Sequence, residues 1–144
     1  MNVLIPIPEI QQRIHVIRGK RVIMDADLAG FYGVTTYNLN KAVSRNQGRF
    51  PDDFSFRLTR EETRNLIFQS GISSSQHGGS RRPMQVFTEK GVAMLASVLR
   101  SDRAVAMSIA IIRAFVQLRE LLAFESWPLF GNGLDKHSAS RFAY

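Results

Sequence analysis

Side chains able to recognise nucleic acid are concentrated between residues 34 and 50, a segment of hydroxyl, amide and cationic groups without a single Asp or Glu. Amide side chains can bridge adenine, lysine and arginine can reach guanine or phosphate, and tyrosine and serine can donate to phosphate oxygens. The segment therefore predicts a surface that contacts duplex DNA. The residues expected to make this contact are Thr36, Tyr37, Asn38, Asn40, Lys41, Ser44, Arg45 and Arg49.

Helical periodicity displays most of these side chains on one face. With about 100° of rotation per residue, Leu39, Ala42 and Val43 share one arc. The opposite arc holds Tyr37, Asn40, Lys41, Ser44 and Arg45, with Asn38 at its edge. Thr35 or Thr36 is placed to cap such a helix, and the free N–H groups at its start suit a phosphate. The pattern predicts a DNA-reading helix, Thr36–Asn46. An ordinary amphipathic surface helix shows the same polarity, so that alternative stays open.

A preceding helix must hold the reading helix in place, and the sequence offers one. Asp25 stands where an N-cap is expected, and Ala29 is the small residue that lets two helices approach each other. Gly33 suits the turn, which needs a residue that tolerates positive φ. Val34 and Leu39 are expected to anchor the pair in the core. These features predict a helix-turn-helix-like pair.

A stretch rich in Ser and Gly, Ser70 to Arg82, has no apolar period and ends in Arg81 and Arg82. It is expected to form a loop. Two interpretations are open: a wing whose two arginines contact DNA phosphates, or an ordinary flexible linker.

The remaining segments predict an α+β fold with small β-hairpins, the helix-turn-helix-like pair and a long C-terminal helix. Short β-prone runs are separated by turn residues, and Thr or Ser caps precede the helical stretches. Residues 124–144 lack periodicity and are expected to form a poorly ordered tail. The expected elements are a hairpin of residues 14–17 and 21–24 around Gly19-Lys20, a strand over 54–58, a helix from the capping box Thr59–Glu62, a strand over 85–87, and helices over 89–99 and 101–123.

The long C-terminal helix carries two apolar arcs, so it must pack against two surfaces. The second arc consists of Val105, Ile109, Ile112 and Val116. Either the chain's own helices cover both arcs, or one arc forms a two-fold dimer interface that pairs two reading helices. The sequence favours a homodimer through the first arc, with an interface of Met107, Ile111, Phe115, Leu118 and Leu122.

Catalytic and metal-binding patterns are missing from the sequence. His15, His77 and His137 have no ligand spacing with one another, and there is no cysteine. Asp25 and Asp27 are better explained as acids at a helix start than as a metal pair. The serines near His77 lack a strand-turn-helix elbow, and no phosphate-binding glycine loop occurs. We therefore expect a protein that is not an enzyme and holds no metal and no cofactor.

The charge fits a polyanionic partner, because a net +7 over 144 residues favours the release of counterions from phosphates. The N-terminus lacks the features of a signal peptide. The most apolar stretch, residues 104–123, is interrupted by Arg113, Arg119 and Glu120, which opposes membrane insertion. The expected location is the cytoplasm, without contact to a membrane.

Four stretches carry a family likeness in the right order: Ile17–Ala29, Phe31–Val34 with Leu39-Asn40, Arg49–Thr59 and Phe87–Leu95. With the following helix, residues 101–122, the chain resembles the KilA-N-related ORF-6-N (ORF6N) domain family of phages and bacterial mobile elements. The resemblance implies a sequence-specific DNA-binding domain, here over residues 10–100, of the kind found at the front of phage regulatory and antirepressor-like proteins. Such domains are usually followed by a separate module, which the last residues of this sequence do not match.

Residues and resemblance together predict a double-stranded DNA-binding protein, a phage- or prophage-type transcriptional regulator that reads the major groove. The alternative is an antirepressor-like interaction module whose last helix captures a phage or host regulator protein. Steep salt dependence of DNA binding favours the first, and a salt-insensitive protein complex favours the second.

Overall fold

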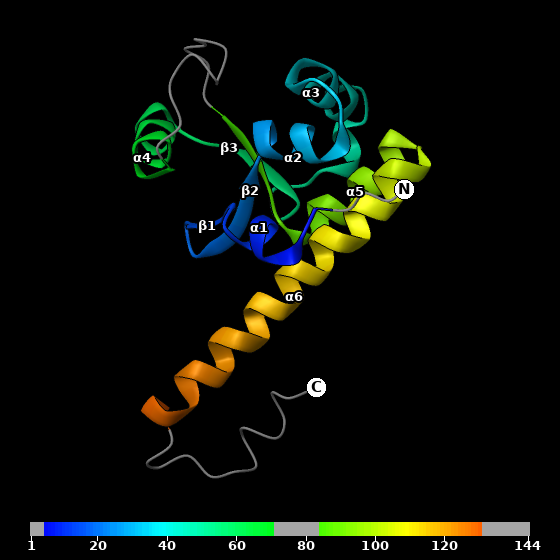
Figure 1. The fold of residues 1–144 in the computed structure, drawn as a ribbon. Helices are drawn as coiled ribbons and strands as arrows, with labels where there is room; N and C mark the ends of the chain where they lie inside the picture. The colour runs from blue at the N-terminus through cyan, green and yellow to red at the C-terminus, as the bar shows by residue number, and fades with distance from the viewer. Residues whose placement is uncertain (1–4, 71–83, 131–144) are drawn as a thin grey trace.

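The chain contains both strands and helices, as its mixture of period-two and helical patterns predicts. The computed structural model describes residues 5–70 and 84–130 (Figure 1). The α+β class, with its hairpin, helix pair and long last helix, is confirmed. In chain order the elements are α1 (Ile7–Gln11), β1 (Ile14–Ile17), β2 (Lys20–Met24), α2 (Asp25–Tyr32), α3 (Thr36–Arg45), the 3-10 turn η1 (Gln47–Arg49), β3 (Ser55–Arg57), α4 (Arg60–Ser70), β4 (Gln85–Phe87), α5 (Glu89–Leu99) and α6 (Asp102–Phe130).

The strands of the described chain form one antiparallel sheet in the order β1-β2-β4-β3. Arg18 and Gly19 join β1 to β2 with positive φ angles of 55° and 75°, as a two-residue type I′ turn requires. The turn thus lies one residue earlier than predicted, and Lys20 begins β2. Arg18 donates hydrogen bonds of 2.9 and 2.7 Å to the carboxylate of Glu62 in α4. These bonds, with one from the backbone N–H of Thr59, lower the pKa of Glu62 to about 2.

The sheet is covered on both faces, and each face has its own apolar core. Because side chains alternate along a strand, Val22 and Met24 of β2 enter the smaller core beneath α4, whereas Ile23 enters the larger one. The larger core also takes side chains from α1, α2, α3, α5 and α6. Figure 1 shows α4 on its own side of the sheet and the other helices on the opposite side. The helix pair α2–α3 therefore rests on the larger core.

Helix α6 completes the larger core. Met107, Ile111 and Phe115 are 1%, 0% and 2% exposed, respectively, and pack in the cluster that includes α1, α2 and α5. Leu118 and Leu122, farther along the same arc, are half-buried. The predicted dimer interface is therefore corrected. Its first three side chains are buried in the chain's own core, so they are not available to a partner.

The end of α6 also differs from the prediction, because the helix continues past Ala123 to Phe130. It occupies the first part of the segment 124–144, for which the sequence predicts poor order, and residues 131–144 lie outside the described chain. Since α6 shares the core of the preceding elements, the boundary expected at residue 100 does not separate two packing units. Within the described ranges, no helix is long and apolar enough to cross a membrane.

Gly91 lets the first turn of α5 lie directly against the backbone that leads into β3. A Cβ at this position would overlap the carbonyl group of Phe54. Thr88 strengthens the contact, because its N–H donates to the same carbonyl at 3.0 Å and its Oγ1 donates to the carbonyl of Asp53 at 2.7 Å. This contact fixes the start of α5 against the sheet.

Replacing Gly91 by alanine is expected to lower the free energy of unfolding by about 1–3 kcal/mol, because the added methyl group forces two backbones apart. Urea unfolding followed by circular dichroism measures the loss. Gly30→Ala in α2 is the matched control, since nothing lies within 4 Å of a Cβ there. That control is expected to gain about 0.5–1 kcal/mol from helix propensity. Equal stability of the two variants would contradict the close contact.

Candidate nucleic-acid interface

The two helices of the predicted pair meet at a tight turn. Gly33 ends α2 in the left-handed region at φ 76°, as its position in the sequence predicts. Its N–H donates to the carbonyl of Gly30 at 3.2 Å, and the N–H of Val34 donates to the carbonyl of Ala29 at 3.0 Å. The side chain of Thr35 then accepts a hydrogen bond of 3.0 Å from the N–H of Asn38, which caps α3. The turn glycine is thus confirmed, and of the two threonines that could cap the helix, Thr35 is the cap.

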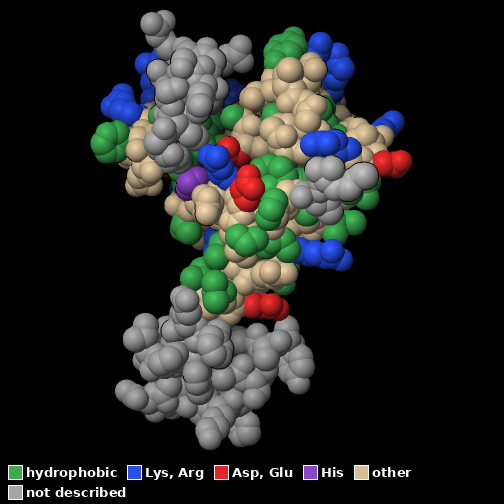
Figure 2. Space-filling model, in the orientation of Figure 1, with side chains coloured by type: hydrophobic (Ala, Val, Ile, Leu, Met, Phe, Trp, Pro, Cys, Tyr) green, Lys and Arg blue, Asp and Glu red, His purple; other side chains and the backbone are tan. Residues whose placement is uncertain are grey.

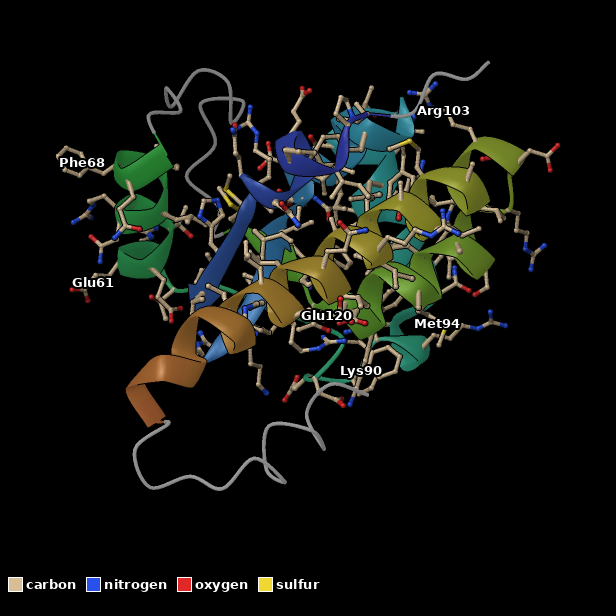
Figure 3. The ribbon with its side chains drawn as sticks, turned by 60° about the horizontal axis from the view of Figure 1, so that its bottom comes forward. Glu61, Phe68, Lys90, Met94, Arg103 and Glu120 are labelled. Carbon is tan, nitrogen blue, oxygen red and sulfur yellow. The ribbon has the colours of Figure 1, made fainter. Side chains whose placement is uncertain are left out.

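Arg103 of α6 holds this turn from outside, a role that the sequence does not reveal. Its Nε and Nη2 donate hydrogen bonds to the carbonyls of Tyr32 and Phe31 at 3.1 and 3.2 Å (Figure 3). These are carbonyls of the last turn of α2, where a cation is favourable. The guanidinium also lies against Gly33, where a Cβ would come within 3.0 Å of Nε. A cation in the first turn of a helix is unfavourable for that helix. The position of Arg103 in the first turn of α6 is therefore a sequence signal for a hydrogen-bond partner elsewhere in the chain.

Helix α3 presents one buried and one exposed face. Leu39, a predicted anchor, is 0% exposed, and Val43 of the same predicted apolar arc is 7% exposed, so both lie in the larger core. Val34, also predicted to be an anchor, is 38% exposed and instead lies at the surface of the turn. Of the side chains predicted to contact DNA in this region, Thr36 is half-buried. Those that are exposed are Tyr37, Asn38, Lys41, Ser44 and Arg45 of α3 and Arg49 of η1.

Asn40 departs from the prediction because it points into the molecule. Its Nδ2 donates a hydrogen bond of 2.8 Å to Oδ2 of Asp25. Asp25 is only 3% exposed and is the first residue of α2, whereas the N-cap position is held by Met24. The hydrogen bond between the Asn40 amide and the Asp25 carboxylate therefore joins α2 to α3, and the Asn40 side chain is not available to a ligand. Asp27, the second acid at this helix start, forms a 3.5 Å ion pair with Arg13, and burial raises the pKa of its carboxyl.

The exposed face of α3 is cationic. In the part of the chain that the structure describes, the ion pairs link Arg13, Arg18, Lys90 and Arg119 to acids, and none includes a cation of α3 or η1. The ammonium group of Lys41 lies 5.4 Å from the ring centre of Tyr37, within range of a cation–π contact. Figure 2 shows Lys and Arg side chains over α3 without acidic side chains beside them on this face. The positive charge of α3 is therefore available to an anionic ligand.

Two further predictions concern other parts of the chain. Arg81 and Arg82, expected in a wing, lie outside the described residues. Across residues 5–70 and 84–130, no three His, Asp or Glu side chains come together as a possible metal site. The contacts that place α3, namely the Asp25–Asn40 bond and Arg103, were not predicted.

Comparison with known families places most of the sheet-and-helix core in a described family. The family model of the ORF6N domain matches residues 12–98, which is more than half of the chain. The matched segment contains the sheet, the helix pair α2–α3 and nearly all of α5, whereas α6 lies beyond it. No curated protein and no solved structure matches the chain.

Proposed function

The chain belongs to the ORF6N domain family, and from this premise we propose that it binds double-stranded DNA by laying the exposed face of α3 in the major groove. The observation that carries the proposal is this face itself. It is cationic, it has no acid from residue 34 to residue 50, and it belongs to the second helix of a braced helix pair. A helix in this position of a helix-turn-helix reads base edges with its exposed side chains.

The exposed side chains divide into base readers and phosphate contacts. Lys41 and Arg45 are one helical turn apart, so they can follow the groove, and the planar guanidinium of Arg45 matches the two acceptors of guanine. The amide of Asn38 matches adenine. Arg49 follows the helix on η1 and suits a phosphate, as does the hydroxyl group of Tyr37. Asn40 is removed from this set by its bond to Asp25.

The salt dependence of binding tests the proposal. A duplex selected from a random pool is labelled, and its binding to the full chain is followed by fluorescence anisotropy at increasing salt concentration. We expect log Kobs to fall linearly with log salt, with a slope of about −0.9 for each phosphate neutralised. A single base-pair change in the selected site is expected to weaken binding by about 1–3 kcal/mol. Binding that ignores both salt and sequence would contradict the proposal.

The biological role that fits this activity is regulation of transcription in a phage or prophage setting. The second candidate, capture of a regulator protein along α6, is favoured by one observation: Val105 and Ile109 on this helix are 46% and 45% exposed. Large apolar side chains so exposed on neighbouring turns mark a surface that suits a protein partner. A protein complex that is insensitive to salt, in a chain without DNA affinity, would favour this candidate.

A further inference from the structure

The outer face of α6 carries an apolar stripe that the chain leaves partly uncovered. The stripe consists of Val105, Ile109, Ile112 and Val116. Val105 and Ile109 are 46% and 45% exposed, and the other two side chains are less exposed. It is distinct from the arc of Met107, Ile111 and Phe115, which fills the larger core. The stripe residues are four, three and four positions apart. This is the spacing of the seam along which two helices pack side by side, with knobs fitting into holes.

The stripe reads the same in both directions. From either end the order is Val, Ile, Ile, Val, and its midpoint falls between Ala110 and Ile111. In a two-fold pair, a residue i contacts residue j of the second copy while j contacts i, so the surface must complement itself. If two α6 helices run antiparallel through this midpoint, Val105 lies opposite Val116 and Ile109 lies opposite Ile112. The sequence of the stripe thus satisfies the requirement of an antiparallel two-fold contact.

The charges at the two ends of the stripe decide the direction of pairing. The same four-and-three spacing, continued outward, reaches Asp102 at one end and Arg119 at the other. Both are exposed, and Arg119 uses Nη1 for its 2.6 Å hydrogen bond to Glu89, which leaves its other donors. An antiparallel pair brings Asp102 of each copy to Arg119 of the other. A parallel pair would place like charges together at both ends, which is destabilising.

We propose that the stripe of α6 is the contact surface for a second copy of this chain, which packs antiparallel about a two-fold axis between Ala110 and Ile111. The dimer does not depend on the proposed function. Only one consequence rests on it: two α3 helices related by a two-fold axis read two copies of a half-site in inverted orientation.

Cysteine cross-linking tests the register, and the chain is suited to it because it contains no cysteine of its own. Val105→Cys and Val116→Cys proteins are oxidised separately and as a mixture. We expect a disulfide-linked dimer of the two different variants in the mixture, because these positions face each other. Each variant alone is expected to give little product, since its two cysteines are separated by the rise of eleven residues, about 16 Å. Equal cross-linking of either variant with itself would overturn the antiparallel register, and no cross-linking in the mixture would overturn the contact.

Sedimentation velocity of the uncross-linked protein tests the assembly. The wild-type chain is expected to sediment as a dimer at micromolar concentration, and Ile109→Lys is expected to convert it to a monomer. Leu121→Lys is the matched control, because Leu121 is 49% exposed on the same helix but lies away from the stripe, and it is expected to remain dimeric. A monomeric wild-type chain, or a dimer that survives Ile109→Lys, would overturn the proposal. Neither assay involves DNA, so failure here is separate from failure of DNA binding.

Discussion

Replacing Lys41 and Arg45 together by alanine is expected to abolish sequence-specific DNA binding while the fold stays intact. Each side chain that contacts a base edge contributes about 1–3 kcal/mol of discrimination, and each phosphate contact contributes about 0.9 to the salt slope. If both contact DNA, affinity for the selected duplex falls toward the level of unrelated sequences. Both side chains are exposed and neither forms an ion pair in the described chain, so the thermal unfolding midpoint is expected to change little. Anisotropy titration and thermal unfolding measure the two effects.

The matched control removes the same charge from elsewhere. Lys20 at the hairpin and Arg113 on α6 are exposed cations that also have no ion pair within the described ranges. The double alanine variant at these positions is expected to keep the selectivity between sequences and to lose only a small part of the affinity, through the lower net charge. If the α3 double variant and this control behave alike, α3 is not the reading helix.

Replacing Asn40 by alanine is expected to have the largest effect on stability, a loss of about 3 kcal/mol. The change removes the amide donor from Asp25, whose carboxylate is almost wholly buried and has a second oxygen already without a partner. Leaving a buried polar group unsatisfied costs about 1–3 kcal/mol, and a charged group lies at the upper end or above. Because this bond joins α2 to α3, DNA affinity is expected to fall as well, although Asn40 does not face the ligand. Chemical unfolding measures the stability.

A reciprocal exchange separates the hydrogen bond from side-chain volume. In the double variant Asp25→Asn with Asn40→Asp, donor and acceptor trade places, and part of the lost stability is expected to return relative to either single variant. A double-mutant cycle gives the coupling between the two positions. Asn38→Ala, an exposed asparagine on the same helix, is expected to change stability by less than about 0.5 kcal/mol. Purely additive effects at positions 25 and 40 would show that the two side chains do not depend on each other.

Local patterns in the sequence predicted the parts of the fold that depend on local physics. The capping box is one case: Thr59 Oγ1 accepts from the N–H of Glu62 at 3.1 Å, and the Glu62 carboxylate accepts from the N–H of Thr59 at 2.8 Å. Gly33 is another, because a helix that must end in the left-handed region favours glycine. Leu39 and Val43 followed from helical periodicity alone. Each of these depends on residues a few positions apart.

The errors concern contacts between distant segments. Periodicity places Asn40 outward, but a buried carboxylate fifteen residues earlier, Asp25, draws it inward. The same method finds an apolar arc at Met107 and Ile111 but does not say whether the arc meets the chain's own core or a partner. The structure answers this through α1 and α5, which occupy that side of α6. Long-range partners of this kind leave no periodic trace in a single sequence.

Because α6 holds the turn between α2 and α3 and completes the larger core, it also determines when the protein can fold during synthesis. Arg103 donates hydrogen bonds to carbonyls of α2 more than seventy residues upstream, and Phe115 packs in the larger core on which the helix pair rests. During synthesis, the N-terminal segment leaves the ribosome first, but its apolar side stays uncovered until α6 has been synthesised. A nascent or prematurely terminated chain that stops before α6 therefore leaves apolar side chains of the larger core exposed, and its helix pair is not held in place. We therefore expect such products to be bound by chaperones or degraded by proteases, and not to compete with the intact protein.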